Sequence, residues 1–172
     1  MPLFFLVVGL VLLGGVATAK VFTSIPKASR DMSQLNPSFR DRAEKFLAAA
    51  RAAGLPLIVT ETFRTPERQA YLYGSGRPGY EFEGIVYGRP GPILTQRSPA
   101  SQPSEHQKRN PDGTPGAKAI DTIPDPKNSR MPGVKADSKD AVTYLRMLEP
   151  LAAEYGLKNL PSINDYGHWE NA

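Results

Sequence analysis

The chain has 172 residues, which suits a single domain with a sizeable hydrophobic core. Its formal net charge is +4, a mild basic excess that suits an anionic partner such as a cell envelope. The sequence has no cluster of Lys and Arg with interleaved aromatic residues, so it does not predict nucleic-acid binding. The absence of cysteine excludes disulfides, cysteine nucleophiles and thiolate metal sites, so a metal would need His, Asp or Glu ligands.

The first 19 residues, MPLFFLVVGLVLLGGVATA, contain no charged side chain. They match a signal peptide with Ala-Thr-Ala before Lys20 as its cleavage site, or a membrane anchor, which needs about 20 apolar residues. A third alternative is a buried N-terminal helix. Either of the first two would place the rest of the chain on or across a membrane, in the cell envelope or outside the cell. We expect a linker over residues 20–35 and one domain over residues 36–172.

The order of the predicted helices and strands favours the α+β class. Cap-then-proline pairs at Asn36-Pro37 and Thr65-Pro66 each predict a helix start. The expected elements are a helix ending at Gly54, a strand over 55–63, a helix ending at Gly74, a hairpin over 81–88, a strand over 119–124, a helix over 138–156 that Pro150 kinks, and a final strand or loop over 160–170. Strands and helices do not alternate regularly, so we expect a small central antiparallel sheet with flanking helices and long Pro/Gly-rich loop insertions.

The chain has only two histidines, and carboxylates stand near both. Together His106, His168 and Asp121 offer two imidazoles and one carboxylate, a set that binds zinc and leaves a position for water, as catalytic zinc sites require. Asp165 would lie close to that water and could take its proton. Taken singly, each residue also suits an ordinary surface loop, and Asn-Asp-Tyr-Gly an ordinary turn.

Several pieces of the sequence, in this order, resemble the zinc D-alanyl-D-alanine carboxypeptidase and L-alanyl-D-glutamate endopeptidase family. That family cleaves peptidoglycan peptides and includes many phage endolysins. The similar pieces are TETFRTPERQAYLYGSG with Arg64 at the family's arginine, GRPGPILT, Ser104-Glu-His106, Ala119-Ile-Asp121 and Asp165-Tyr-Gly-His168-Trp-Glu170. The similarity covers roughly residues 38 to 171.

The resemblance implies zinc-dependent hydrolysis of amide bonds in peptidoglycan stem peptides, with Zn²⁺ held by His106, Asp121 and His168. It implies that Asp165 is the general base and that Arg64 stabilises the oxyanion or holds the substrate carbonyl. The alternative for Arg64 is a surface ion pair with Glu61 or Glu67.

Two further residues near the histidines receive supporting roles. Ser104 either binds substrate or caps a turn, and Glu170 orients His168 as an outer partner of a metal ligand. Trp169 is expected in the core.

The chain departs from the family pattern around the expected site. Fourteen residues separate His106 from Asp121, more than the family usually has, and residues 75–88 resemble a second insertion. The base is Asp rather than the commoner Glu. Two other functions therefore stay open: a catalytically silent envelope- or virion-associated module on the same fold, and a membrane protein whose soluble part binds an anionic polymer.

Overall fold

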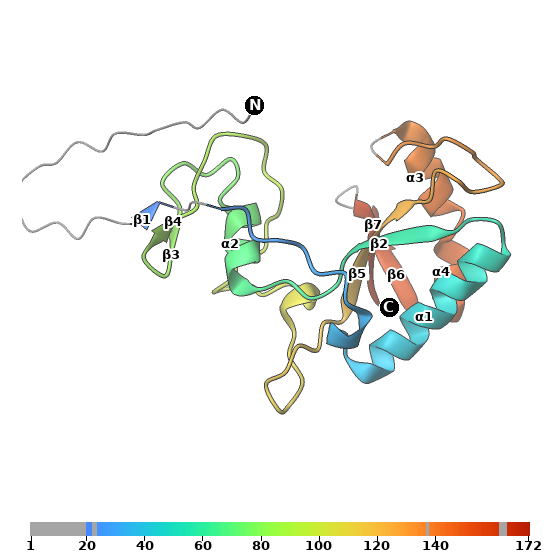
Figure 1. The fold of residues 1–172 in the computed structure, drawn as a ribbon, viewed down its shortest axis with the longest axis horizontal. Coiled ribbons are helices and arrows are strands. Elements are labelled where there is room, and N and C mark those ends of the chain that lie inside the picture. Colours follow the sequence, from blue (N-terminus) through green and yellow to red (C-terminus); the bar gives the residue numbers. More distant parts are fainter. Residues whose placement is uncertain (1–19, 22–23, 137, 162–164) are drawn as a thin grey trace, which may run out of the picture.

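The computed structural model describes residues 20–21, 24–136, 138–161 and 165–172 (Figure 1). The expected signal peptide or membrane anchor, residues 1–19, lies outside the described residues. Within the described ranges, no helix combines the length and the apolar character that a membrane span needs.

A four-stranded antiparallel sheet in the order β2-β5-β7-β6 forms the centre of the fold. Its strands are β2 (Leu57–Glu61), β5 (Ala119–Pro124), β6 (Leu157–Leu160) and β7 (Asp165–Asn171). Asp121 on β5 is paired with Glu61 on one side and with His168 on the other. The predicted α+β fold with a small antiparallel sheet is therefore confirmed, and the sheet itself brings two of the candidate metal ligands together.

The two predicted cap-and-proline starts each open a helix. Helix α1 (Pro37–Ala52) begins where the Asn36 side chain accepts a hydrogen bond from the backbone of Phe39, and α2 (Pro66–Tyr73) is capped in the same way by Thr65. Helix α1 ends before Gly54, whose positive φ of 76° suits glycine. In Figure 1, α1 and α4 lie on one side of the four-stranded sheet and α2 on the other.

The prediction of one helix over residues 138–156 with a kink at Pro150 is wrong. Two helices occupy this stretch, α3 (Lys139–Arg146) and α4 (Glu149–Glu154), with Pro150 in the first turn of α4. Proline has no N–H to donate to the carbonyl four residues before it, and its ring clashes with that carbonyl. The chain therefore stops one helix and starts another instead of bending a continuous one.

A second, smaller sheet lies beside α2 and includes the predicted hairpin. Strands β3 (Glu81–Phe82) and β4 (Ile85–Val86) form the hairpin, and β1 (Lys20–Val21) pairs with β4. The stretch expected as a linker also contacts the domain. Leu35 is buried, the short 3-10 helix η1 (Met32–Gln34) precedes it, and the carbonyl of Ser29 accepts a hydrogen bond from the Thr62 N–H.

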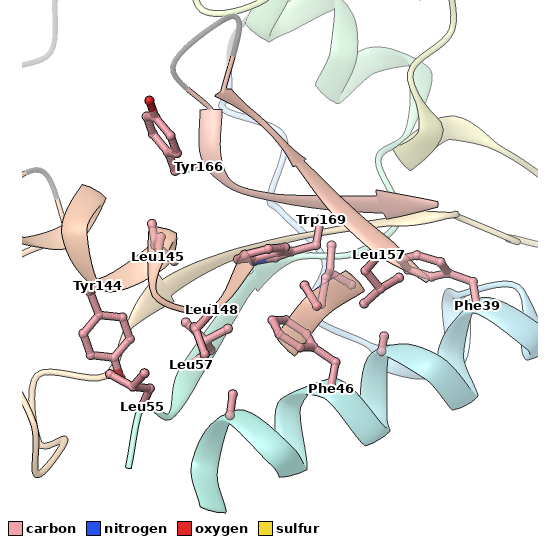
Figure 2. Packing of buried hydrophobic residues seen from close by; sticks show 14 of the residues in the cluster. Phe39, Phe46, Leu55, Leu57, Tyr144, Leu145, Leu148, Leu157, Tyr166 and Trp169 are labelled. Atoms are coloured by element: carbon pink, nitrogen blue, oxygen red, sulfur yellow. The ribbon is translucent and has the colours of Figure 1, made fainter. Parts of the chain in front are cut away.

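The hydrophobic core fills the space between the sheet and α1, α3 and α4 (Figure 2). Trp169 on β7 is fully buried, and the centroid of its ring lies 4.9 Å from the centroid of the Phe46 ring on α1. Its indole N–H donates to Thr122 Oγ1 at 2.9 Å. Side chains alternate between the two faces of a strand. Because Trp169 points into this core, its neighbours His168 and Glu170 face the opposite side of the sheet.

Replacing Trp169 by alanine should lower the free energy of unfolding by about 3–5 kcal/mol, because it opens a large cavity and leaves Thr122 without its indole partner. Urea denaturation of metal-free protein, followed by circular dichroism, measures the loss without involving the candidate site. Leu94→Ala is the control: Leu94 is 54% exposed, so it should change stability by less than about 0.5 kcal/mol. If Trp169→Ala cost no more than Leu94→Ala, the core described above would be misplaced.

Candidate metal centre

Three ligand atoms from separate parts of the chain converge on one point. His106 Nε2 lies 3.0 Å from Asp121 Oδ1, His168 Nδ1 lies 2.9 Å from the same oxygen, and the two nitrogens lie 3.2 Å apart. Both histidines are buried, while the Asp121 side chain is 25% exposed. The structure thus brings together the three residues that the sequence predicts as ligands.

The remaining nitrogen of each imidazole has a partner of its own. His106 Nδ1 lies 2.5 Å from the Thr62 carbonyl oxygen, and His168 Nε2 lies 3.1 Å from Glu170 Oε2. Both partners accept hydrogen bonds, so each of these ring nitrogens carries the proton. The lone pairs of the neutral rings are then on His106 Nε2 and His168 Nδ1, the two atoms that face Asp121. Histidine ligands of metals are typically oriented in this way, by a carbonyl or a carboxylate on the far nitrogen.

The spacing of the three atoms fits a small metal ion. Tetrahedral bonds of about 2.0 Å separate neighbouring ligands by roughly 3.3 Å, so these atoms would need to move apart by only a few tenths of an ångström. Two imidazole lone pairs and a carboxylate oxygen that face one another also require a cation between them, either a proton or a metal. His106, Asp121 and His168 can therefore hold a metal ion.

Local structure holds His106 in place despite the long loop that follows it. His106 lies on a short 3-10 helix, η2 (Glu105–Gln107), and its carbonyl accepts a hydrogen bond from the Arg64 N–H at 2.9 Å. The Lys118 N–H donates to the Glu105 carbonyl at 2.9 Å. The loop after His106 therefore leaves and returns at the same place, which explains how His106 and Asp121 can lie together with fourteen residues between them.

Ser104 stands at the N-cap position of η2. Its backbone N–H donates to Gln107 Oε1 at 3.1 Å, and its hydroxyl donates to Gln69 Oε1 at 3.4 Å. The Ser104 side chain is largely buried by these contacts.

Arg64 is buried, and its guanidinium contacts the site through Asp121. It donates to Asp121 Oδ2 at 3.0 Å, to Glu61 Oε2 at 2.6 and 3.0 Å, and to Gln69 Oε1 at 2.9 Å. The ion pair between Arg64 and Glu61 is thus present. It is buried, whereas the alternative interpretation of the sequence expected it on the surface. No pattern in the sequence indicated that Arg64 would also contact Asp121, a candidate metal ligand.

Asp165 stands at the start of β7, with its side chain exposed beside the cluster. Although Asp165 is exposed at the surface, partial loss of water around its carboxyl raises its pKa, and the nearby negative charge of Asp121 raises it further. Pairing between β6 and β7 shifts between Lys158 and Leu160, an irregularity that lies next to Asp165. A carboxyl with a raised pKa beside three residues that can hold a metal ion is suited to exchanging protons with water there.

The cluster shifts the proton affinities of its own members. Burial alone would raise the pKa of Asp121, but the charge and hydrogen bonds of His106 and His168 outweigh it and hold that pKa far below its usual value. Burial alone would lower the pKa of His168, but its hydrogen bonds to Asp121 and Glu170 raise the pKa to about 9. The hydrogen bond from His168 also lowers the pKa of Glu170.

In the metal-free protein, the free energy of unfolding should fall as the pH rises through the pKa of His168. Because this pKa is raised from 6.5 to about 9, protonation of His168 stabilises the fold fully below pH 6.5 and ceases to do so above about 9. The shift corresponds to a loss of up to roughly 3 kcal/mol. Urea denaturation of chelator-treated protein across this range tests it. A His168→Gln variant should lack the step, and an equal step in that variant would assign it to another group.

Three residues that support the cluster were given no role in it from the sequence: Glu61, Thr62 and Gln69. Glu61 accepts hydrogen bonds from both Arg64 and Arg68, and the fully buried Gln69 links Arg64 to the carbonyl of Arg97. Thr62 contributes its backbone carbonyl, which no side-chain pattern can reveal. Gln69 on the predicted short helix and Glu61 on the predicted strand could have indicated such a network. Burying either side chain without hydrogen-bond partners costs free energy.

Comparison with known proteins does not identify the chain: no protein-family model matches it, and a search of curated proteins gave no match.

Proposed function

We propose that this chain is a zinc-dependent hydrolase of amide bonds in peptidoglycan stem peptides, acting as an endopeptidase or a D,D-carboxypeptidase in cell-wall lysis or remodelling. The observation that carries the proposal is the convergence of His106, Asp121 and His168, with the far nitrogen of each imidazole already bonded to its own acceptor. Two histidines and one carboxylate form a ligand set typical of catalytic zinc. The proposal that peptidoglycan is the substrate depends on the sequence resemblance, which is found in the segments around these three residues.

When bound, zinc would polarise the scissile carbonyl and make a water molecule acidic enough to react near neutral pH. The chain's own residues supply the rest. Asp165 would accept the proton of the attacking water and return it to the leaving amine, a role that suits a carboxyl with a raised pKa. Glu170 would keep His168 in the tautomer whose Nδ1 faces the metal, because its carboxylate accepts the Nε2–H.

The proposed substrate also sets the proposed place of action. Peptidoglycan lies outside the cytoplasmic membrane, so we propose that the domain acts in the cell envelope or outside the cell, delivered by residues 1–19 as an anchor or a signal peptide, or as part of a phage particle.

Purified peptidoglycan distinguishes this hydrolase from a silent module on the same fold. Incubation with the protein should release new free amino groups, and a chelator should stop that release until zinc is restored. If the protein binds zinc but releases no amino groups from peptidoglycan or from isolated stem peptides, the proposed activity is wrong and the silent module is favoured.

A further inference from the structure

We infer that Arg64 is a positioning residue: it fixes Asp121 as a ligand that offers one oxygen, rather than two, to a metal. The inference rests on the proposed metal site and on the contacts of Asp121, on β5, with the two histidines and with Arg64, which lies in the loop between β2 and α2. Asp121 Oδ1 faces both histidines, at 3.0 Å and 2.9 Å, whereas Oδ2 accepts a hydrogen bond from Arg64 Nη2 at 3.0 Å. The two oxygens of one carboxylate thus have different partners.

Arg64 can act in this way because its own guanidinium is held on several sides. Glu61 Oε2 accepts from both Nε and Nη2, and Gln69 Oε1 accepts from Nη1. Gln69 is fully buried and is itself held by the carbonyl of Arg97. A planar guanidinium bonded along two edges has little freedom to rotate, so it presents a fixed donor to Asp121.

The position of Asp121 in the sheet explains why such a donor is useful. Asp121 is paired in register with Glu61 on β2 and with His168 on β7, so its backbone is fixed, but its carboxylate can still rotate about the side-chain bonds. Without Arg64, both oxygens could turn toward the histidines. Occupying Oδ2 prevents this and leaves a coordination position for water or substrate, as a catalytic metal site requires.

The same contacts give Arg64 a different role from binding a substrate carbonyl or an oxyanion. Its hydrogen bonds to Glu61, Gln69 and Asp121 orient the guanidinium toward protein groups, and the side chain is only 10% exposed. We therefore assign Arg64 an effect on the metal that should be measurable without any substrate.

Cobalt-substituted protein provides that measurement, because four-coordinate Co²⁺ absorbs visible light much more strongly than five- or six-coordinate Co²⁺. Arg64→Gln should weaken the visible absorption per bound Co²⁺ and should weaken zinc affinity by about 10- to 100-fold in competition with a chromophoric chelator. The direction of the affinity change is decisive. Loss of a cation near the metal would by itself tighten binding, so weaker binding shows that Arg64 acts by holding Asp121.

Arg68→Gln is the matched control. Arg68 also donates to Glu61, at 3.1 Å, but its described contacts do not include Asp121. This variant should keep the wild-type cobalt spectrum and zinc affinity. If the Arg64 and Arg68 variants change alike, the effect comes through Glu61 and the inference is wrong; it is also wrong if Arg64→Gln leaves the spectrum unchanged or tightens zinc binding.

Arg64→Lys is the second variant, in case the glutamine variant does not fold. Lysine keeps a positive charge near Glu61, but a single ammonium cannot reproduce the fork between Glu61 and Asp121. It should fold and still show the weaker cobalt absorption, and a wild-type spectrum would overturn the inference. Absence of metal binding by the wild-type protein would instead refute the proposed metal site itself.

Discussion

Replacing either His106 or His168 with alanine should abolish both stoichiometric zinc binding and amide hydrolysis. The two imidazole nitrogens supply two of the three ligand atoms, and cysteine is absent from the chain, so no thiolate can substitute for them. Elemental analysis of the purified variants measures the metal, and release of amino groups from peptidoglycan measures the activity. Zinc affinity depends steeply on ligand number, so the loss should be complete at micromolar protein concentrations.

Loss of metal must be separated from loss of fold in these variants. His106 is almost fully buried, and alanine there leaves the Thr62 carbonyl without its partner. Asp121→Asn weakens the third ligand with little change of shape and should also lose zinc, whereas Asp125→Asn, four residues further along the chain, should keep it. The site is misassigned if the protein with both histidines replaced still carries one equivalent of zinc.

Replacing Asp165 with asparagine should leave zinc in place and reduce turnover by about 10²- to 10⁴-fold, the range expected when a general base is removed. Asparagine keeps the shape of the side chain but cannot accept a proton. Steady-state hydrolysis of a defined muropeptide, with the zinc content of the same sample, makes the measurement. The effect should appear in kcat, because proton transfer belongs to the chemical step.

Glu170→Gln is the matched comparison for Asp165, because both acids flank His168. Glutamine can still accept the hydrogen bond from His168 Nε2 through its amide oxygen, so this variant should lose some zinc affinity and keep most of its activity once saturated with zinc. If Asp165→Asn stays near wild-type activity while zinc-saturated Glu170→Gln is inactive, the two roles are reversed.

Much of the site could be predicted because strand pairing and residue chemistry act on short stretches of sequence. The run around Asp121 has the composition of a buried strand, and His168 stands next to Trp169, whose size requires burial. Alternation along β7 then places His168 on the face opposite the core. Two histidines in a chain without cysteine leave few choices for the nitrogen ligands, whereas the choice of Asp121 as the carboxylate depended on the resemblance of the pieces around it.

The parts that could not be predicted depend on contacts between distant segments. Arg64 was expected to face substrate, but its partner Asp121 is 57 residues away in the chain, and only the pairing of β2 with β5 brings them together. The Thr62 carbonyl that orients His106 carries no side-chain signal. The separation of α3 from α4 was missed because the apolar spacing continues across the break, although Pro150 marks the start of the second helix.

The most direct test is the hydrolysis of one defined muropeptide by metal-free protein before and after addition of one equivalent of zinc. Mass analysis of the products identifies the bond that is cut and counts the turnovers. We expect no cleavage without metal, and cleavage at a single amide bond of the stem peptide after zinc is added, with no such recovery in the protein lacking both histidines. Full cleavage by the metal-free protein, or none by a protein that has bound its equivalent of zinc, would contradict a zinc-dependent peptidase centred on His106, Asp121 and His168.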